Sequence, residues 1–169
     1  TALLLRASVT RFVIPAANRK RYEQLQIMLA EFPELDGKVT LLEGQSRQAM
    51  TASNVVLVNS GTATLEAMLL RKPMVMSYRV GKITYGIVSR LVTTEWFALP
   101  NILAGRSIVP EFIQDAAVPS AMAGAVRRLL DEKEASDVIA TFDEIHRLLK
   151  KSGDPGAEAA KAVLGLCES

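Results

Sequence analysis

The chain has 169 residues, of which 49% are apolar and 22% are charged, and its formal net charge is +2. This composition is typical of a soluble globular protein with a single core. No apolar run approaches the roughly 18 residues of a membrane-spanning helix, and residues 1–5 lack the basic start of a secretory signal. One cysteine, Cys167, excludes an internal disulfide, and with the single His146 it leaves no zinc-type cluster. We therefore expect one cytoplasmic domain that contacts a membrane only peripherally, if at all.

Positive charge is concentrated in the first 30 residues, which hold five basic side chains against a single acid, Glu23. The basic residues are Arg6, Arg11, Arg19, Lys20 and Arg21. Such a cluster attracts phosphates or anionic lipid headgroups, but so few charges attract only weakly through salt, which favours a plain solvated helix face. No regular interleaving of aromatic residues accompanies the charges, which argues against a nucleic acid as partner.

Short apolar segments alternate with helical segments through the first half of the chain. We expect helices at residues 1–9, 18–32, 45–51 and 62–70, and strands at residues 11–15, 38–42, 55–58 and 73–77. Four short apolar strands separated by helices favour parallel pairing through right-handed crossovers. The predicted fold class is therefore α/β, with a doubly wound parallel sheet.

The second half of the chain has a mostly helical pattern. We expect helices at residues 83–92, 109–114, 119–130, 133–149 and 155–167. A doubly wound half of this kind normally begins with a strand and a phosphate-binding turn, whereas this chain opens on a helix. We therefore interpret the chain as a piece of a longer protein.

The last helix is expected to be separate from the rest. Residues 152–156 read Ser-Gly-Asp-Pro-Gly, a plausible hinge, so we assign residues 1–153 to the α/β domain and 154–169 to a terminal helix. This helix carries an apolar stripe of Ala157, Ala160, Val163, Leu164 and Cys167. An apolar stripe without a partner favours association, which makes a homodimer one expectation.

The most informative segment is residues 55–66, VVLVNSGTATLE, in which an apolar strand leads through a Ser-Gly-Thr turn into a helix. Ligands of open parallel sheets bind beyond the strand ends, where helix N-termini favour anions such as a diphosphate. Gly61 permits close approach, and the hydroxyls of Ser60, Thr62 and Thr64 add donors. Glu66 lies about 6 Å further along the helix axis, where a carboxylate suits two ribose hydroxyls. Alternatively, Ser60 only caps the helix and Glu66 is a solvated acid.

Two longer motifs resemble the C-terminal domain of the lipid-A-disaccharide synthase family. They are NSGTATLEAMLLRKPMVMSYR at residues 59–79 and LPNILAGRSIVPEFIQ at residues 99–114. Members of this family are inverting glycosyltransferases of the two-domain GT-B fold. The resemblance implies that UDP-2,3-diacylglucosamine and 2,3-diacylglucosamine 1-phosphate are joined by a β-1,6 bond, without a metal or cofactor, at the cytoplasmic face of a bacterial inner membrane. It also implies that the catalytic base and acceptor site belong to an N-terminal domain outside this chain.

The resemblance assigns residues to the donor nucleotide. It implies that Ser60, Gly61 and Thr62, with Thr64 beside them, meet the diphosphate, and that Glu66 meets the ribose. Other residues are implied near the donor sugar or diphosphate. These are Tyr78, Arg79, Asn101, Arg106, Glu111 and Gln114.

Each assignment outside the turn has a simpler alternative. The alternative for Asn101 is that its amide caps a backbone group from a loop. Glu111 and Gln114, three apart on one expected helical face, are equally suited to plain solvation. Arg79 and Arg106 are candidates to neutralise the leaving UDP in place of a metal, but Arg106 also suits a surface charge.

Residues 83–97, ITYGIVSRLVTTEWF, carry an apolar stripe at helical spacing. The stripe favours core packing, with an acyl-chain groove or a membrane-surface face as the alternative. For the whole chain we favour the donor half of a glycosyltransferase. The alternatives are a non-catalytic α/β binding domain and a UDP-sugar epimerase of similar fold, which the LPNILAG block disfavours.

Overall fold

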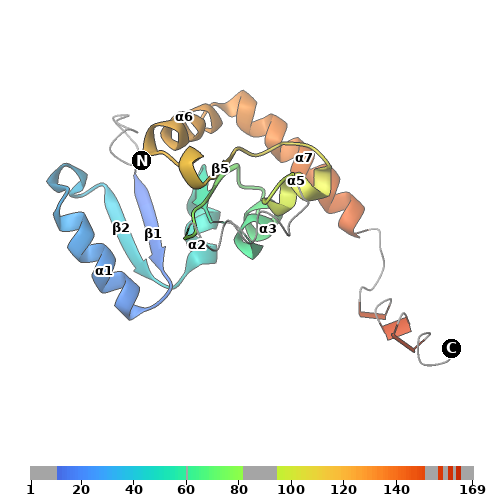
Figure 1. Ribbon diagram of the computed structural model, residues 1–169, viewed down its shortest axis with the longest axis horizontal. Coiled ribbons are helices and arrows are strands. Elements are labelled where there is room, and N and C mark those ends of the chain that lie inside the picture. Colours follow the sequence, from blue (N-terminus) through green and yellow to red (C-terminus); the bar gives the residue numbers. More distant parts are fainter. Residues whose placement is uncertain are drawn as a thin grey trace.

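The computed structural model describes residues 11–59, 61–81, 95–150, 156–157, 160–161 and 163–164. The strands are β1 (Phe12–Ala16), β2 (Val39–Glu43), β3 (Val56–Val58), β4 (Met74–Tyr78) and β5 (Glu111–Ile113). The helices are α1 (Arg19–Ala30), α2 (Ser46–Ala52), α3 (Thr62–Leu69), α5 (Leu99–Ala104), α6 (Pro119–Leu129) and α7 (Glu132–Lys150), with 3-10 turns at Pro33–Leu35 and Gln114–Ala116. Strands and helices alternate along the chain (Figure 1), which confirms the predicted α/β class.

The strands form two sheets, in which β1 pairs with β2, and β4 lies between β3 and β5. Every pair is parallel, with Phe12 opposite Val39 and Val56 opposite Met74. The predicted parallel direction is therefore confirmed. Within the described ranges, however, no pairing joins β1 to β3, so the structure has two open sheets where the sequence predicts one.

Strand β4 is the centre of the core. Met74 and Met76 pack in one cluster with Met68 of α3 and Phe142 of α7, whereas Val75 packs in another cluster with residues of α6. Successive side chains of a strand point to opposite faces of the sheet. Helices therefore cover both faces of the β3–β4–β5 sheet, as a doubly wound arrangement requires (Figure 1).

The prediction of a helix at residues 109–114 is wrong. Glu111–Ile113 form β5, with Phe112 opposite Ser77 and Ile113 opposite Tyr78, and a 3-10 turn follows. Gln114 has a left-handed backbone with φ 51°, which ends the strand. Pairing with the buried strand β4 decides the conformation here, because a segment this short has too little helical periodicity of its own.

Residues 99–104, expected to form a loop around Asn101, form helix α5 (Leu99–Ala104) instead. Pro100 lies in the first turn and Gly105, with φ 63°, follows the last residue. Proline at a helix start and left-handed glycine just past its end are ordinary boundary signals. Both signals are present in the sequence, but the helix between them has only six residues.

The other predicted helices within the described ranges are confirmed with small shifts at their ends. In α1, the Asn18 side chain caps the helix by accepting a hydrogen bond from the Arg21 N–H at 3.0 Å. The predicted helices at residues 1–9 and 83–92 lie outside the described residues. The described part of the last helix is helical, and Val163 and Leu164 are each 62% exposed. Among the helices that the structure describes, none has the length and apolar character needed to cross a bilayer.

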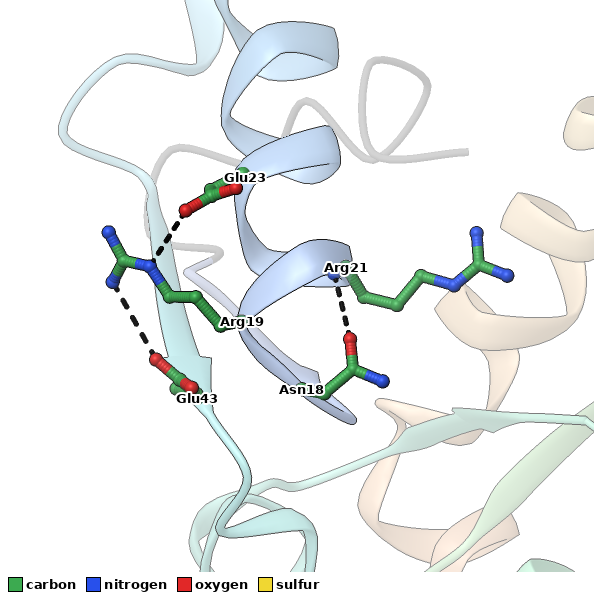
Figure 2. A network of polar contacts seen from close by, with 5 residues as sticks. All are labelled: Asn18, Arg19, Arg21, Glu23 and Glu43. Carbon is green, nitrogen blue, oxygen red and sulfur yellow. Dashed lines mark hydrogen bonds and ion pairs between the residues drawn. The ribbon is translucent and has the colours of Figure 1, made fainter.

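The basic start of α1 is partly neutralised by nearby acids (Figure 2). Arg19 donates to Glu23 at 2.9 Å and lies 3.6 Å from Glu43 at the end of β2. The hydrogen bond to Glu23 is the main cause that raises the pKa of Arg19 above its usual value. The Arg21 side chain extends away from this pair and donates to Gln24 at 2.8 Å. These contacts favour a locally paired helix face over an anion-binding cluster at Arg19.

Candidate functional site

The turn between β3 and α3 has the predicted strand–turn–helix form. Val58 at the end of β3 is buried, and Gly61 is the N-cap of α3 with φ 102° and ψ −152°. This backbone region is essentially restricted to glycine. Ser60 lies outside the described residues, and among those described no side chain caps the start of α3. The first N–H groups of this helix therefore form the candidate anion site.

Thr64 holds the turn from inside. Its side chain is fully buried, and its hydroxyl donates to the Gly61 carbonyl at 2.7 Å. The same oxygen accepts a hydrogen bond from the Leu99 N–H, at the start of α5, at 3.2 Å. Thr62, by contrast, is exposed at the helix start. The Thr64 hydroxyl, predicted to donate to a phosphate, therefore donates its hydrogen bond within the fold, whereas Thr62 is exposed.

Glu66 lies on α3, four residues after Thr62, and is half-buried. In the described part of the chain, its carboxylate makes no hydrogen bond or ion pair. A half-buried carboxylate is partly desolvated and gains from hydroxyl donors. The ribose contact of Glu66 therefore stays a prediction, for which the carboxylate has no competing partner among the described residues.

Tyr78 and Arg79 lie at the end of β4, the strand next to β3. Because β3 and β4 are parallel, their carboxyl ends meet at one edge of the sheet. Tyr78 is half-buried and Arg79 is exposed. The structure therefore brings these two predicted residues to the same edge as the Gly61 turn.

Asn101 and Glu111 form a hydrogen-bonded pair behind this edge. Asn101 is fully buried, and its side-chain amide donates to Glu111 at 2.7 Å. The Glu111 carboxylate also accepts the backbone N–H groups of Phe97 and Ala98, each at 2.9 Å. Both side chains therefore bind backbone groups, and the alternative proposed for Asn101, capping of the backbone, is present in the structure.

Gln114 and Arg106 also bind groups within the chain. The Gln114 side chain accepts from the Val80 N–H at 2.8 Å and donates to the Val80 carbonyl at 3.0 Å. This two-way bond holds the backbone just after Arg79. Arg106 donates to Thr141 of α7 at 3.4 Å. Gln114 thus fixes the segment that carries Arg79, while Arg106 reaches towards α7.

Sequence reasoning missed the backbone partners of these side chains, at Val80, Phe97, Ala98 and Leu99. They lie between 13 and 35 residues from the side chains that bind them, so these hydrogen bonds cannot be predicted from a local sequence pattern. The one available signal was an Asn, a Glu and a Gln spaced along an otherwise apolar motif.

No group of three acidic, histidine or cysteine side chains suited to a metal occurs in the described ranges.

The chain also has a hollow of about 490 Å³ beside α1 and β2, lined in part by Tyr22, Leu29, Phe32 and Val39. None of the predicted site residues lines it. The candidate site is therefore the edge at Gly61, Glu66 and Tyr78.

Comparison with known proteins identifies the family of the chain. The family model described as lipid-A-disaccharide synthetase matches residues 2–162. Lipid-A-disaccharide synthase of Pseudomonas aeruginosa is 48% identical over 166 residues, which cover 98% of this chain and 42% of the relative. The synthase of Alcanivorax borkumensis is 47% identical over 160 residues (94% and 41%), and that of Cellvibrio japonicus is 46% identical over 156 residues (92% and 40%). The chain thus spans about two fifths of the length of these curated relatives. It belongs to the lipid-A-disaccharide synthetase family.

Proposed function

We propose that this chain is the donor-nucleotide-binding part of a lipid A glycosyltransferase. The donor would be UDP-2,3-diacylglucosamine and the acceptor 2,3-diacylglucosamine 1-phosphate, joined by a β-1,6 bond with inversion at the anomeric carbon. The curated relatives carry the name lipid-A-disaccharide synthase, which supports the reaction class. The relatives are more than twice as long as this chain, which supports a longer protein whose further residues complete the active site; we place these residues in an N-terminal domain.

One observation carries the proposal: a glycine-dependent turn at a helix start and a carboxylate without a partner among the described residues lie on the same helix. Gly61 opens α3 with φ 102°, and Glu66 follows within two turns without a partner among the described residues. A helix N-terminus favours the diphosphate through its N–H groups and dipole. Glu66, further along the axis, is then placed to accept hydrogen bonds from the ribose hydroxyls.

The remaining residues at this edge have roles consistent with an inverting displacement. Arg79 is exposed beside the turn, so its guanidinium can approach the leaving diphosphate and stabilise the charge that develops on it. The base that deprotonates the acceptor hydroxyl belongs, in this proposal, to the N-terminal domain. The enzyme would work on the cytoplasmic face of the inner membrane and contact it peripherally, because both substrates carry acyl chains.

Calorimetry with UDP and with inorganic pyrophosphate tests the assignment of the site. Glu66→Ala should weaken UDP by about 1.5 to 3 kcal/mol, the value of hydrogen bonds to a charged acceptor, and leave pyrophosphate almost unchanged. Glu144→Ala, on the exposed face of α7, is the matched control and should change neither affinity.

Equal losses for both ligands would contradict the ribose contact. A thermal shift by UDP that ADP reproduces fully would instead favour an unspecific binding domain. If neither nucleotide binds the wild-type chain, the proposed function itself is wrong.

A further inference from the structure

We propose that Glu111 is a positioning residue for the diphosphate turn, acting through the start of α5 and the Thr64 hydroxyl without touching the ligand. The inference rests on the proposed function, because it names what orients the N–H groups of that same site. It assigns to Glu111 a role different from the ligand contact that the sequence suggests.

The first half of the connection joins β5 to the start of α5. One carboxylate oxygen of Glu111 accepts from the Ala98 N–H and the Asn101 side chain, at 2.9 and 2.7 Å. The other accepts from the Phe97 N–H at 2.9 Å. Both oxygens are therefore occupied by donors of residues 97–101, which fixes the backbone of this segment against β5.

The second half joins α5 to the turn. Leu99, the residue directly after Ala98, donates its N–H to the Thr64 hydroxyl oxygen at 3.2 Å. The hydroxyl donates its own proton to the Gly61 carbonyl at 2.7 Å, and the Thr64 N–H also reaches this carbonyl at 3.0 Å. An unbroken chain of contacts thus runs from Glu111 to Gly61.

The planarity of the Gly61–Thr62 peptide explains how these contacts orient an N–H group that can bind an anion. The Gly61 carbonyl and the Thr62 N–H belong to one planar trans peptide, so they point in opposite directions. Two bonds from Thr64 pull the Gly61 carbonyl inward, towards the buried Thr64 side chain. The Thr62 N–H is then held pointing outward from the helix start, where an anion binds.

The carboxylate is needed because the groups that bind it in the described part of the chain are all donors. Phe97, Ala98 and Asn101 all present N–H groups to Glu111. A glutamine at this position would keep one acceptor oxygen but turn an NH₂ group towards an N–H. Glu111→Gln should therefore release part of residues 97–99 while changing the side-chain volume very little.

The test compares pyrophosphate affinity and stability for a small set of variants of the full chain. Glu111→Gln and Thr64→Val should each weaken inorganic pyrophosphate about tenfold, the effect of one hydrogen bond. Because both act on the same connection, the double variant should lose little more than the worse single variant. Thr64→Ser, which keeps the hydroxyl, should retain wild-type affinity, as should Asp115→Asn, a control at an exposed acid four residues beyond Glu111.

Urea unfolding of the same variants separates positioning from support of the fold. If Glu111→Gln and Thr64→Val lower stability but leave pyrophosphate affinity intact, the positioning role is wrong. The positioning role is also wrong if the affinity losses of the two single variants multiply in the double variant, because the free-energy changes of independent sites add. Should Glu111→Gln fail to fold, wild-type pyrophosphate affinity in the nearly isosteric Thr64→Val would still overturn the proposal, because the connection from Glu111 to Gly61 runs through the Thr64 hydroxyl.

A nuclear magnetic resonance measurement on the chain without ligand tests the role of Glu111 independently of the proposed function. The backbone amide resonance of Thr62 should move in Glu111→Gln, although the two residues lie on different elements, and should stay in place in Asp115→Asn. An unmoved Thr62 resonance contradicts the connection. If the wild-type chain binds neither pyrophosphate nor UDP, the proposed function fails, while the Thr62 resonance still reports whether Glu111 controls the turn.

Discussion

Asn101 and Val109 form a reciprocal pair, since the Asn101 side-chain oxygen accepts from the Val109 N–H and its amide donates to the Val109 carbonyl, both at 2.9 Å. The same oxygen also accepts from the Ile108 N–H at 2.8 Å. Asn101 and Val109 are buried. A single side chain therefore satisfies the backbone between α5 and β5 in the way that a neighbouring strand would.

The first prediction concerns this pair. Asn101→Leu keeps the side chain close in size but leaves the buried Val109 N–H and carbonyl without partners. We expect a loss of about 3 kcal/mol in the free energy of unfolding, measured by urea denaturation. Leu103→Ala, on an exposed part of the same helix, is the control and should cost about 1 kcal/mol or less. Equal midpoints for Asn101→Leu and the wild type would show that the pair contributes nothing.

The second prediction concerns the backbone of the diphosphate turn. A Cβ on Gly61 meets nothing within 4 Å, but the residue has φ 102°, which L side chains rarely adopt. Gly61→Ala should therefore destabilise the chain by about 1 to 3 kcal/mol through backbone strain alone. Gly124→Ala, in the interior of α6 and equally free of close contacts, should stabilise it by about 0.5 to 1 kcal/mol. Thermal unfolding of the two variants should thus shift in opposite directions.

The third prediction concerns the attachment of α7 to the core. Phe142 is 1% exposed and belongs to the cluster that contains Met74 and Met76. Phe142→Ala should cost about 3 to 5 kcal/mol, because it removes a large buried side chain and leaves a cavity. Leu148→Ala, at a position that is 67% exposed on the same helix, should change stability far less. Similar losses for both variants would mean that α7 is not held by its buried face.

The fourth prediction concerns the ion pair between Arg71, just after α3, and Asp143 of α7. Their side chains are 59% and 36% exposed, so solvent screens the attraction. A double-mutant cycle with Arg71→Met and Asp143→Asn should give a coupling of at most about 1 kcal/mol, reduced further by added salt. A coupling several times larger would mean that this pair, rather than the apolar cluster, fixes α7 against α3.

The fifth prediction concerns catalysis. The 169-residue chain alone should transfer no sugar from labelled UDP-2,3-diacylglucosamine, because an inverting displacement needs a base aligned with the acceptor hydroxyl. The control is a full-length relative, the lipid-A-disaccharide synthase of Pseudomonas aeruginosa, which should form the disaccharide in the same assay. Product formed by the 169-residue chain would place the base among its own residues.

Most strands and helices were predictable because their signals are local. The apolar runs at residues 73–77 and 55–58 lie on strands, and the Asn18 cap opens α1 as its residue type suggests. Residues 109–114 were predicted wrongly because their conformation depends on pairing with β4, which the sequence of the segment does not encode.

In the candidate site, too, the features with local signals were predictable and the contacts between distant residues were not. The Gly61 turn was predictable, since glycine between a strand and a helix has few other uses. The connection from Glu111 to Thr64 was not, because its bonds join side chains to backbone groups of distant residues. Such partners depend on how α5 packs against α3, and sequence spacing carries no information about that.

Each of the two sheets ends in a strand with an open edge. Among the described residues β1 pairs with β2 alone and β3 pairs with β4 alone, so one edge of β1 and one edge of β3 carry no neighbouring strand.

Those two edges have a practical consequence for handling the polypeptide. Among the described residues β1 and β3 do not pair with each other, and each presents an apolar side chain to solvent, Val13 at 40% and Leu57 at 46% exposure. Open strand edges with apolar side chains act as templates on which other chains add and aggregate. Solubility during purification should therefore decline steeply with concentration, and a lysine in place of Val13 or Leu57 should extend the usable range.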